Sequence, residues 1–106
     1  MVGLGRRDAV IAELDVVGRR LVAALRRHGG DAVVVDNTLA VLANLCRGHP
    51  VNRGRVGAAG ALKAAVASMR AHPDDEGLQK SGAAFICNAC DQNEANQTAA
   101  GEAGAV

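Results

Sequence analysis

The sequence predicts an all-α fold, an α-solenoid in which helical units of similar sequence stack on one another. An internal repeat is the first observation: the passage LANLCRGHPVN is matched 44 positions later by ICNACDQNEAN, with asparagine, cysteine and asparagine in step. Apolar residues at helical spacing are the second, and glycines and prolines between the helical stretches are the third. Because one helical repeat cannot bury its apolar face alone, such units cover one another in a stack.

The 44-position register runs through most of the chain and needs no gap. It joins Asn44 to Asn88, Cys46 to Cys90 and Asn52 to Asn96, with further matches on both sides. Matches in one register across a whole unit are unexpected in unrelated sequence, even in one rich in alanine and glycine. They predict repeats over 6–48 and 49–92 and a partial repeat over 93–106.

The clearest unit begins with a short helix from Pro50 to about Ala58, since proline fits the first helical turn, where its missing N–H is not needed. Gly57 and Gly60 then predict a sharp turn, because glycine adopts backbone conformations that other residues avoid. A second helix follows from Ala61 and ends before Pro73, since the residue preceding a proline disfavours the helical region. Its apolar stripe consists of Leu62, Ala65, Val66 and Met69.

The third helix of this unit is expected to be capped by Asp74 and Asp75 and to end near Asp91. Its apolar residues are Leu78, Phe85, Ile86 and Ala89. The preceding unit is expected to follow the same three-helix plan, with Gly29-Gly30-Asp31 as the break. Its third helix has Val35, Leu39, Leu42 and Cys46 on the inward face. Its first two helices are expected within RRDAVIAELDVVGRRLVAAL, where Asp15-Val16-Val17 replaces the Ala-Gly turn.

Several of these pieces resemble armadillo repeats. The stretches NRGRVGAAGALKAAVASMR and NQTAAGEAGAV resemble the first helix, Ala-Gly turn and second helix of that family, and LAVLANLCRG and AAFICNACDQ resemble its third helix. The phrase MRAHPDDEGLQKSGAAFICNA also resembles long armadillo arrays of protist and algal type and the armadillo region of leucine-rich repeat kinases. The resemblance implies a right-handed superhelix of three-helix repeats, whose third helices line a concave face that binds an extended segment of a partner protein.

A polar stripe on the two third helices is the candidate binding site. It consists of Asn37, Ala40, Asn44 and Arg47 in one repeat, and of Ser81, Ala84, Asn88 and Asp91 in the next. The resemblance implies that Asn44 and Asn88 hydrogen-bond the backbone of an extended peptide, a task that suits an amide because it both donates and accepts. The alternative is that both amides bond neighbouring helix ends and only hold the repeats together.

The stripe differs from that of armadillo proteins of nuclear import, which carry tryptophan four residues before the asparagine. Ala40 and Ala84 occupy those positions, and the chain contains no Trp or Tyr. Because binding hot spots favour Trp, Tyr and Arg, this argues against recognition of basic localisation peptides. We therefore carry a second hypothesis, that these are spacer repeats which extend a larger scaffold and bind no partner themselves.

Composition excludes several other classes. The net charge is +1, so no overall field attracts nucleic acid or a membrane surface. No apolar run approaches the roughly 18 residues of a membrane span, and the start lacks the apolar core of a signal peptide. An odd number of cysteines, three, argues against a disulfide framework. We expect an intracellular, cytoplasmic protein, with the nucleus as the alternative compartment.

The pair Cys87 and Cys90 forms a C-x-x-C motif, which raises a thiol-enzyme or metal-protein alternative. Redox motifs of this kind gain reactivity at a helix N-terminus, whereas this pair lies near a C-terminus, and zinc needs about four ligands. We therefore expect buried packing for these two cysteines, and neither catalytic residues nor a metal or cofactor. His28 and His72, at the ends of second helices, are expected to bond the last carbonyls there.

No polar capping repeat is visible, so we expect a segment of a longer array. Uncapped ends also lead us to expect self-association through Met1–Leu14 or the Asn93–Val106 helix.

Overall fold

The computed structural model describes the backbone of residues 2–104 and the side chains of residues 9–104, so Met1, Ala105 and Val106 lie outside the description. Every regular element of that range is an α-helix, which confirms the all-α prediction. The helices are α1 (Val2–Arg27), α2 (Ala32–Cys46), α3 (Pro50–Ala58), α4 (Ala61–Ala71), α5 (Glu76–Cys90) and α6 (Glu94–Ala103).

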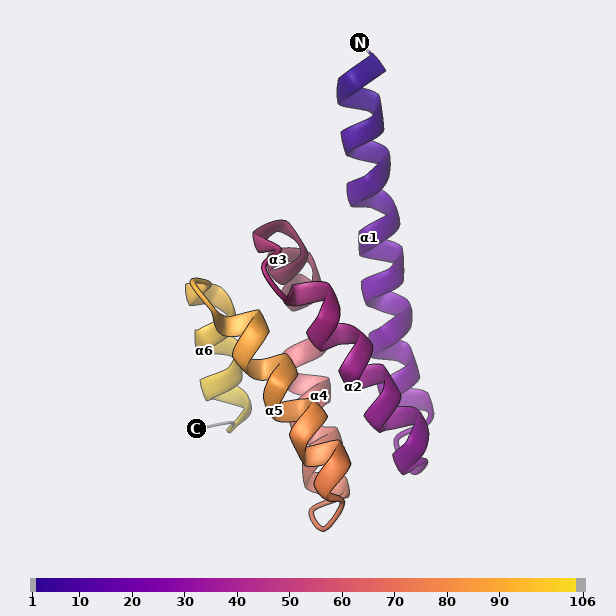
Figure 1. Cartoon of the computed structure of the whole chain (residues 1–106), viewed down its shortest axis with the longest axis vertical. Helices are drawn as coiled ribbons and strands as arrows, with labels where there is room; N and C mark the ends of the chain where they lie inside the picture. The colour runs from indigo at the N-terminus through magenta and orange to yellow at the C-terminus, as the bar shows by residue number, and fades with distance from the viewer. Residues whose placement is uncertain (1, 105–106) are drawn as a thin grey trace.

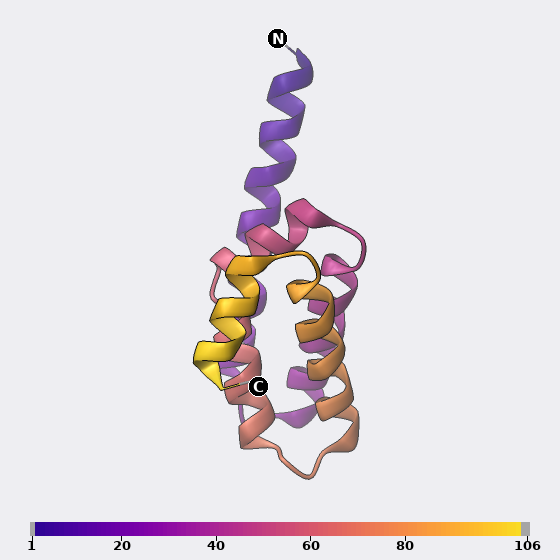
Figure 2. The ribbon, with the colours of Figure 1, turned by 90° about the vertical axis from the view of Figure 1, so that its left-hand side faces the viewer.

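The helices pack in two rows (Figures 1 and 2). α2 and α5 lie side by side and form one row, while α4 packs behind them between the second half of α1 and α6. α3 crosses one end of the body and contacts α1, α2, α5 and α6. The handedness of any superhelix stays a prediction from the sequence.

Three of the predicted helices agree closely with the structure. α3 and α4 begin at Pro50 and Ala61 as expected, and α5 ends at Cys90. The cap of α5 is Asp75, whose carboxylate accepts the Leu78 N–H at 3.0 Å. Asp74, the other expected cap, lies one residue earlier in the turn.

Residues 2–27 differ from the expected plan, because α1 is one continuous helix of 26 residues. α3 and α4 are separated at Gly60, which has a φ of +87° in the left-handed region. The residue 44 positions earlier is Val16, and a β-branched residue strongly disfavours that conformation. The helix therefore runs through the expected turn, and its first half projects past the other helices (Figures 1 and 2).

The 44-residue register of the sequence is repeated in the helix bounds. α2 and α5 each have 15 residues, and both their first and their last residues lie 44 positions apart. The starts of α3 and α6 lie 44 positions apart as well. The inward face predicted for α2 is confirmed, since its four apolar residues are fully buried in one core with Phe85 of α5.

Candidate functional site

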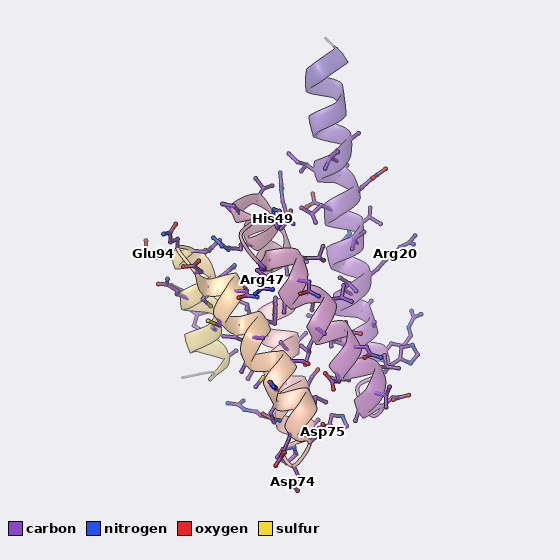
Figure 3. All side chains as sticks on the ribbon, viewed as in Figure 1. Arg20, Arg47, His49, Asp74, Asp75 and Glu94 are labelled. Atoms are coloured by element: carbon purple, nitrogen blue, oxygen red, sulfur yellow. The ribbon has the colours of Figure 1, made fainter. Side chains whose placement is uncertain are left out.

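The candidate stripe lies on α2 and α5, the two helices that pack side by side (Figure 1). Asn37 and Asn44 on α2 and Arg47 at its C-cap are exposed, and Ala40 is half-buried. Ser81 and Asn88 on α5 are half-buried, whereas Ala84 and the C-cap residue Asp91 are exposed. Figure 3 shows Arg47 and His49 where the end of α2 turns into α3. The two halves of the stripe therefore differ in burial although they match in sequence.

The half of the stripe on α5 is engaged with preceding helices. The Asn88 Nδ2 donates to the backbone carbonyl of Ala43 on α2 at 3.0 Å. The Ser81 hydroxyl donates to the carboxylate of Asp36, also on α2. These two contacts join α5 to α2, so both residues serve packing between successive helical layers, where a layer means the helices of one 44-residue unit.

Asp91, the last stripe residue after α5, is held by Arg53 of α3. Two guanidinium nitrogens of Arg53 donate to the backbone carbonyl of Asp91 at 3.1 Å and to its carboxylate at 3.3 Å. The side chain of Arg53 is nearly buried, whereas that of Asp91 is largely exposed. Because one partner faces solvent, we regard the pair as a positioning contact rather than a strong ion pair.

The half of the stripe on α2 has no such engagement. Among the residues whose side chains the structure describes, none is hydrogen-bonded to the side chains of Asn37, Asn44 or Arg47. These residues correspond in register to Ser81, Asn88 and Asp91. The same positions thus make contacts between layers on one helix and present unpaired polar groups on the other.

A second pair of amides, at the starts of α3 and α6, was not assigned a role from the sequence. The Asn52 Nδ2 donates to Leu45 O at 2.6 Å, and the Asn96 Nδ2 donates to Ala89 O at 2.8 Å. The two acceptors also lie 44 positions apart. The final carbonyls of a helix lack partners within the helix, so each amide ties the end of a third helix to the next short helix.

Asn96 makes a further contact between units. Its Nδ2 also donates to Arg53 O at 2.9 Å, and only 4% of the residue is exposed. Gly57 allows this approach, because a Cβ at that position would lie 1.9 Å from the Asn96 Oδ1. The signal that could have revealed this role is the recurrence of asparagine in register, just after the end of each third helix.

The three cysteines differ in burial. Cys46 is buried, and desolvation raises the pKa of its thiol to about 11, although the nearby Arg53 opposes the shift. Burial, and then the neighbouring Cys87, raises the pKa of Cys90. The expectation of buried packing is wrong for Cys87, which is exposed, and Cys90 is half-buried. Within residues 9–104, no three His, Cys, Asp or Glu side chains gather as a metal site would require.

The histidines at the ends of second helices also differ from expectation. The Nε2 of His72 lies 2.6 Å from the carbonyl of Gly29, in the turn after α1, so this nitrogen carries the proton and donates. His72 therefore joins two layers instead of capping its own helix. His28, its counterpart in register, is exposed.

None of the described helices combines the length and the apolar character needed to cross a membrane. Comparison with protein-family models, with curated proteins and with solved structures finds no match for this chain. The resemblance to armadillo repeats accordingly stays a prediction from the sequence.

Proposed function

We propose that this chain is a non-enzymatic protein-interaction module, a scaffold segment that binds a further helical layer across the exposed side of α2. One observation carries the proposal. The residues through which α5 contacts preceding helices have their register counterparts exposed on α2. Positions that join layers in one half of the molecule are therefore presented to solvent in the other half.

Apolar residues follow the same rule as the polar ones. Phe85 of α5 is 0% exposed, whereas its register counterpart on α2, Val41, is 46% exposed. Val33, at the start of α2, is more exposed still, although its register counterpart Gly77 is exposed too. Exposed valines beside unpaired amides resemble the apolar centre and polar surroundings of a protein interface. Burial of this surface would therefore contribute favourable free energy to binding a helical partner.

The second candidate is the binding of an extended peptide, as the armadillo resemblance implies. It is favoured by the exposed amides of Asn37 and Asn44, which offer both donors and acceptors to a peptide backbone. It receives less support from the α5 half of the stripe, because Ser81 and Asn88 already have partners within the chain. The two candidates differ in the partner they require: a packed helical layer or an extended strand.

A lengthened chain tests whether units of this sequence stack on one another, which the scaffold proposal requires. In it, residues 1–88 are followed directly by residues 45–106, so that Asn88 precedes a second copy of Leu45 as Asn44 precedes the first. If the units are stackable, the added unit folds as helix and the melting temperature rises, because each added repeat contributes an interface with its neighbour. Circular dichroism, thermal melting and limited proteolysis measure this outcome.

The matched control is the same lengthened chain with Phe85→Lys in the added unit only. A charge at a position that is fully buried in the original unit should leave the added unit unfolded and the stability near that of the original chain. The proposal fails if the unmodified added unit stays protease-sensitive, or if it lowers the melting temperature.

The peptide candidate is tested by selection from a display library of proline-containing peptides that cannot form helices. Nuclear magnetic resonance shifts then map the bound residues. Saturable binding that moves the amides of Asn37 and Asn44, and that is lost in Asn44→Ala, would establish the second candidate. If no saturable binding is found and an added unit is stably incorporated, the peptide candidate is rejected and the scaffold function is supported.

A further inference from the structure

We propose that the helical layer received by α2 is the α4–α5 end of a second copy of this chain, so that copies assemble head to tail. This inference rests on the proposed scaffold function and names the partner of the same surface. Its basis is the internal contact between α5 and α2. The residues 44 positions before the α5 side of this contact lie on α2, and the residues 44 positions after its α2 side lie on α5, so one chain presents both surfaces of a second contact of the same kind.

The α4–α5 end has an open groove of about 320 Å³, lined by Val66, Met69, Arg70, Pro73, Gln79 and Ile86 together with Gly104. Its two half-buried apolar residues, Met69 and Ile86, correspond in register to Leu25 and Leu42. These counterparts are at most 2% exposed, whereas Val66 is already buried within the chain. Met69 and Ile86 thus occupy positions that are covered by a neighbouring layer in the preceding unit.

Gln79 departs from this pattern, because its counterpart is the buried Val35. Its amide nitrogen donates to Met69 O at 2.8 Å and to His72 O at 2.9 Å. Its donors are therefore already satisfied within the chain, so a layer packed over the groove does not leave them unpaired.

Polar groups at the two ends complement each other in the same register. In each internal pair, the residue later in the chain is replaced by its counterpart 44 positions earlier, and its partner by the counterpart 44 positions later. The internal bond from Asn88 to Ala43 O thus predicts a bond from Asn44 of one copy to Cys87 O of the other. The internal bond from Ser81 to Asp36 predicts that Asn37 of one copy faces Lys80 of the other. An asparagine oxygen accepts from a lysine ammonium, so each exposed group meets a partner of suitable chemistry.

Two further contacts follow the same rule. The internal contact of Arg53 with Asp91 predicts that Gln97 of one copy faces Arg47 of the other. The Gln97 nitrogen already donates to Cys90 O at 2.9 Å, which leaves its oxygen available to accept from the arginine. The contact of His72 with Gly29 O predicts that His28 of one copy donates to Pro73 O of the other. Each predicted pair joins a donor to an acceptor, and no pair juxtaposes like charges.

The continuous α1 leaves room for this arrangement. Two units earlier in the register, which is 88 positions, α6 corresponds to residues 6–15, and these form part of the first half of α1. That half projects past the body instead of folding back as α3 does before α4 (Figures 1 and 2). The place of a short helix before the second half of α1 is thus open to the α6 of another copy. Because the two contacting surfaces differ, the contact is head to tail and does not close as a two-fold dimer.

Sedimentation velocity of the 1–106 chain over a wide concentration range tests the proposal, with one variant for each end. Val41→Arg blocks the α2 side and Ile86→Arg blocks the groove. We expect the average mass of the unmodified chain to rise with concentration beyond that of a dimer. Each variant alone should stay monomeric, and their equimolar mixture should form a heterodimer and stop there, because only one complementary pair of ends remains.

Ile86 is half-buried, so a pair of exposed residues provides a test that does not depend on its packing. Asn37→Lys should weaken self-association by like-charge repulsion of Lys80, and adding Lys80→Glu in the same chain should restore it. Neither change touches the core, and unchanged circular dichroism confirms that the fold is kept.

The proposal is overturned if the unmodified chain stays monomeric at all concentrations, or if Val41→Arg assembles as the unmodified chain does. It is also overturned if assembly is lost in Val10→Lys, on the projecting half of α1, but kept in Val41→Arg. A monomeric chain whose lengthened form gains stability would overturn only self-assembly and leave the scaffold function standing. A lengthened form with an unfolded added unit would overturn the scaffold function itself.

Discussion

Replacing Asn88 by alanine should separate the packing role of the stripe from a binding role. The substitution removes the 3.0 Å bond to Ala43 O, but that carbonyl also accepts the Arg47 N–H at 3.2 Å and is not left unpaired. The cost should therefore be that of an ordinary hydrogen bond, about 0.5–1.5 kcal/mol. For a domain of this size, 1 kcal/mol corresponds to roughly 4–8 °C in melting temperature.

Asn44→Ala is a matched control, because Asn44 occupies the same position in a helix of the same length. Both substitutions gain the same helix propensity, up to about 0.7 kcal/mol, so this gain cancels when the two variants are compared. Thermal melting followed by circular dichroism should place Asn88→Ala about 2–12 °C below Asn44→Ala. Equal melting temperatures would show that the bond between α5 and α2 contributes nothing to stability, and the layer argument would lose its energetic basis.

Other predictions concern the buried amide, two glycines and the cysteines. Asn96→Ala loses two buried hydrogen bonds and should lower the free energy of unfolding by about 1–3 kcal/mol in urea denaturation. Gly57→Ala should also destabilise, since its Cβ meets that amide, whereas Gly54→Ala meets nothing within 4 Å in the same helix and should stabilise by about 0.5–1 kcal/mol. Because burial raises the pKa of Cys46 from 9.0 to about 11 in the folded chain, the protonated thiol should contribute stability below pH 9, and this contribution should be lost as the pH rises to about 11. A Cys46→Ala chain with the same dependence of stability on pH would contradict this. A thiol reagent near neutral pH should label Cys87 rapidly and Cys46 only on unfolding, and equal rates would refute the burial argument.

Local punctuation explains which helices could be predicted from the sequence. Pro50, Gly60 and Pro73 restrict the backbone by their own chemistry, so α3 and α4 agree closely with the prediction. The first unit lacks such punctuation at the position where the repeat predicts a turn. Val16 has no tendency to adopt the left-handed turn of Gly60, so α1 continued through it.

The sequence predicts which helix face carries the candidate site, but it does not predict the hydrogen-bond partners of the residues on that face. Spacing alone places Asn44 and Asn88 on equivalent faces, yet only Asn88 has a neighbouring helix to receive its donor. Which layer covers a polar group is a property of the packed structure and is not contained in the periodicity of one helix. The same reason explains why Asn96 was not recognised as the most buried amide of the chain.

Several hydrogen bonds between layers span a similar length of chain. They join Asn88 to Ala43, Ser81 to Asp36, Asn96 to Arg53 and His72 to Gly29, which are 45, 45, 43 and 43 positions apart. Each layer therefore closes a loop of about one unit, and the entropic cost of closure depends on that length rather than on the whole chain. In a longer array of such units, the sequence separation of the contacts would stay the same, so added length would not slow folding through more distant contacts. Each unit could fold on the preceding one as the ribosome released it.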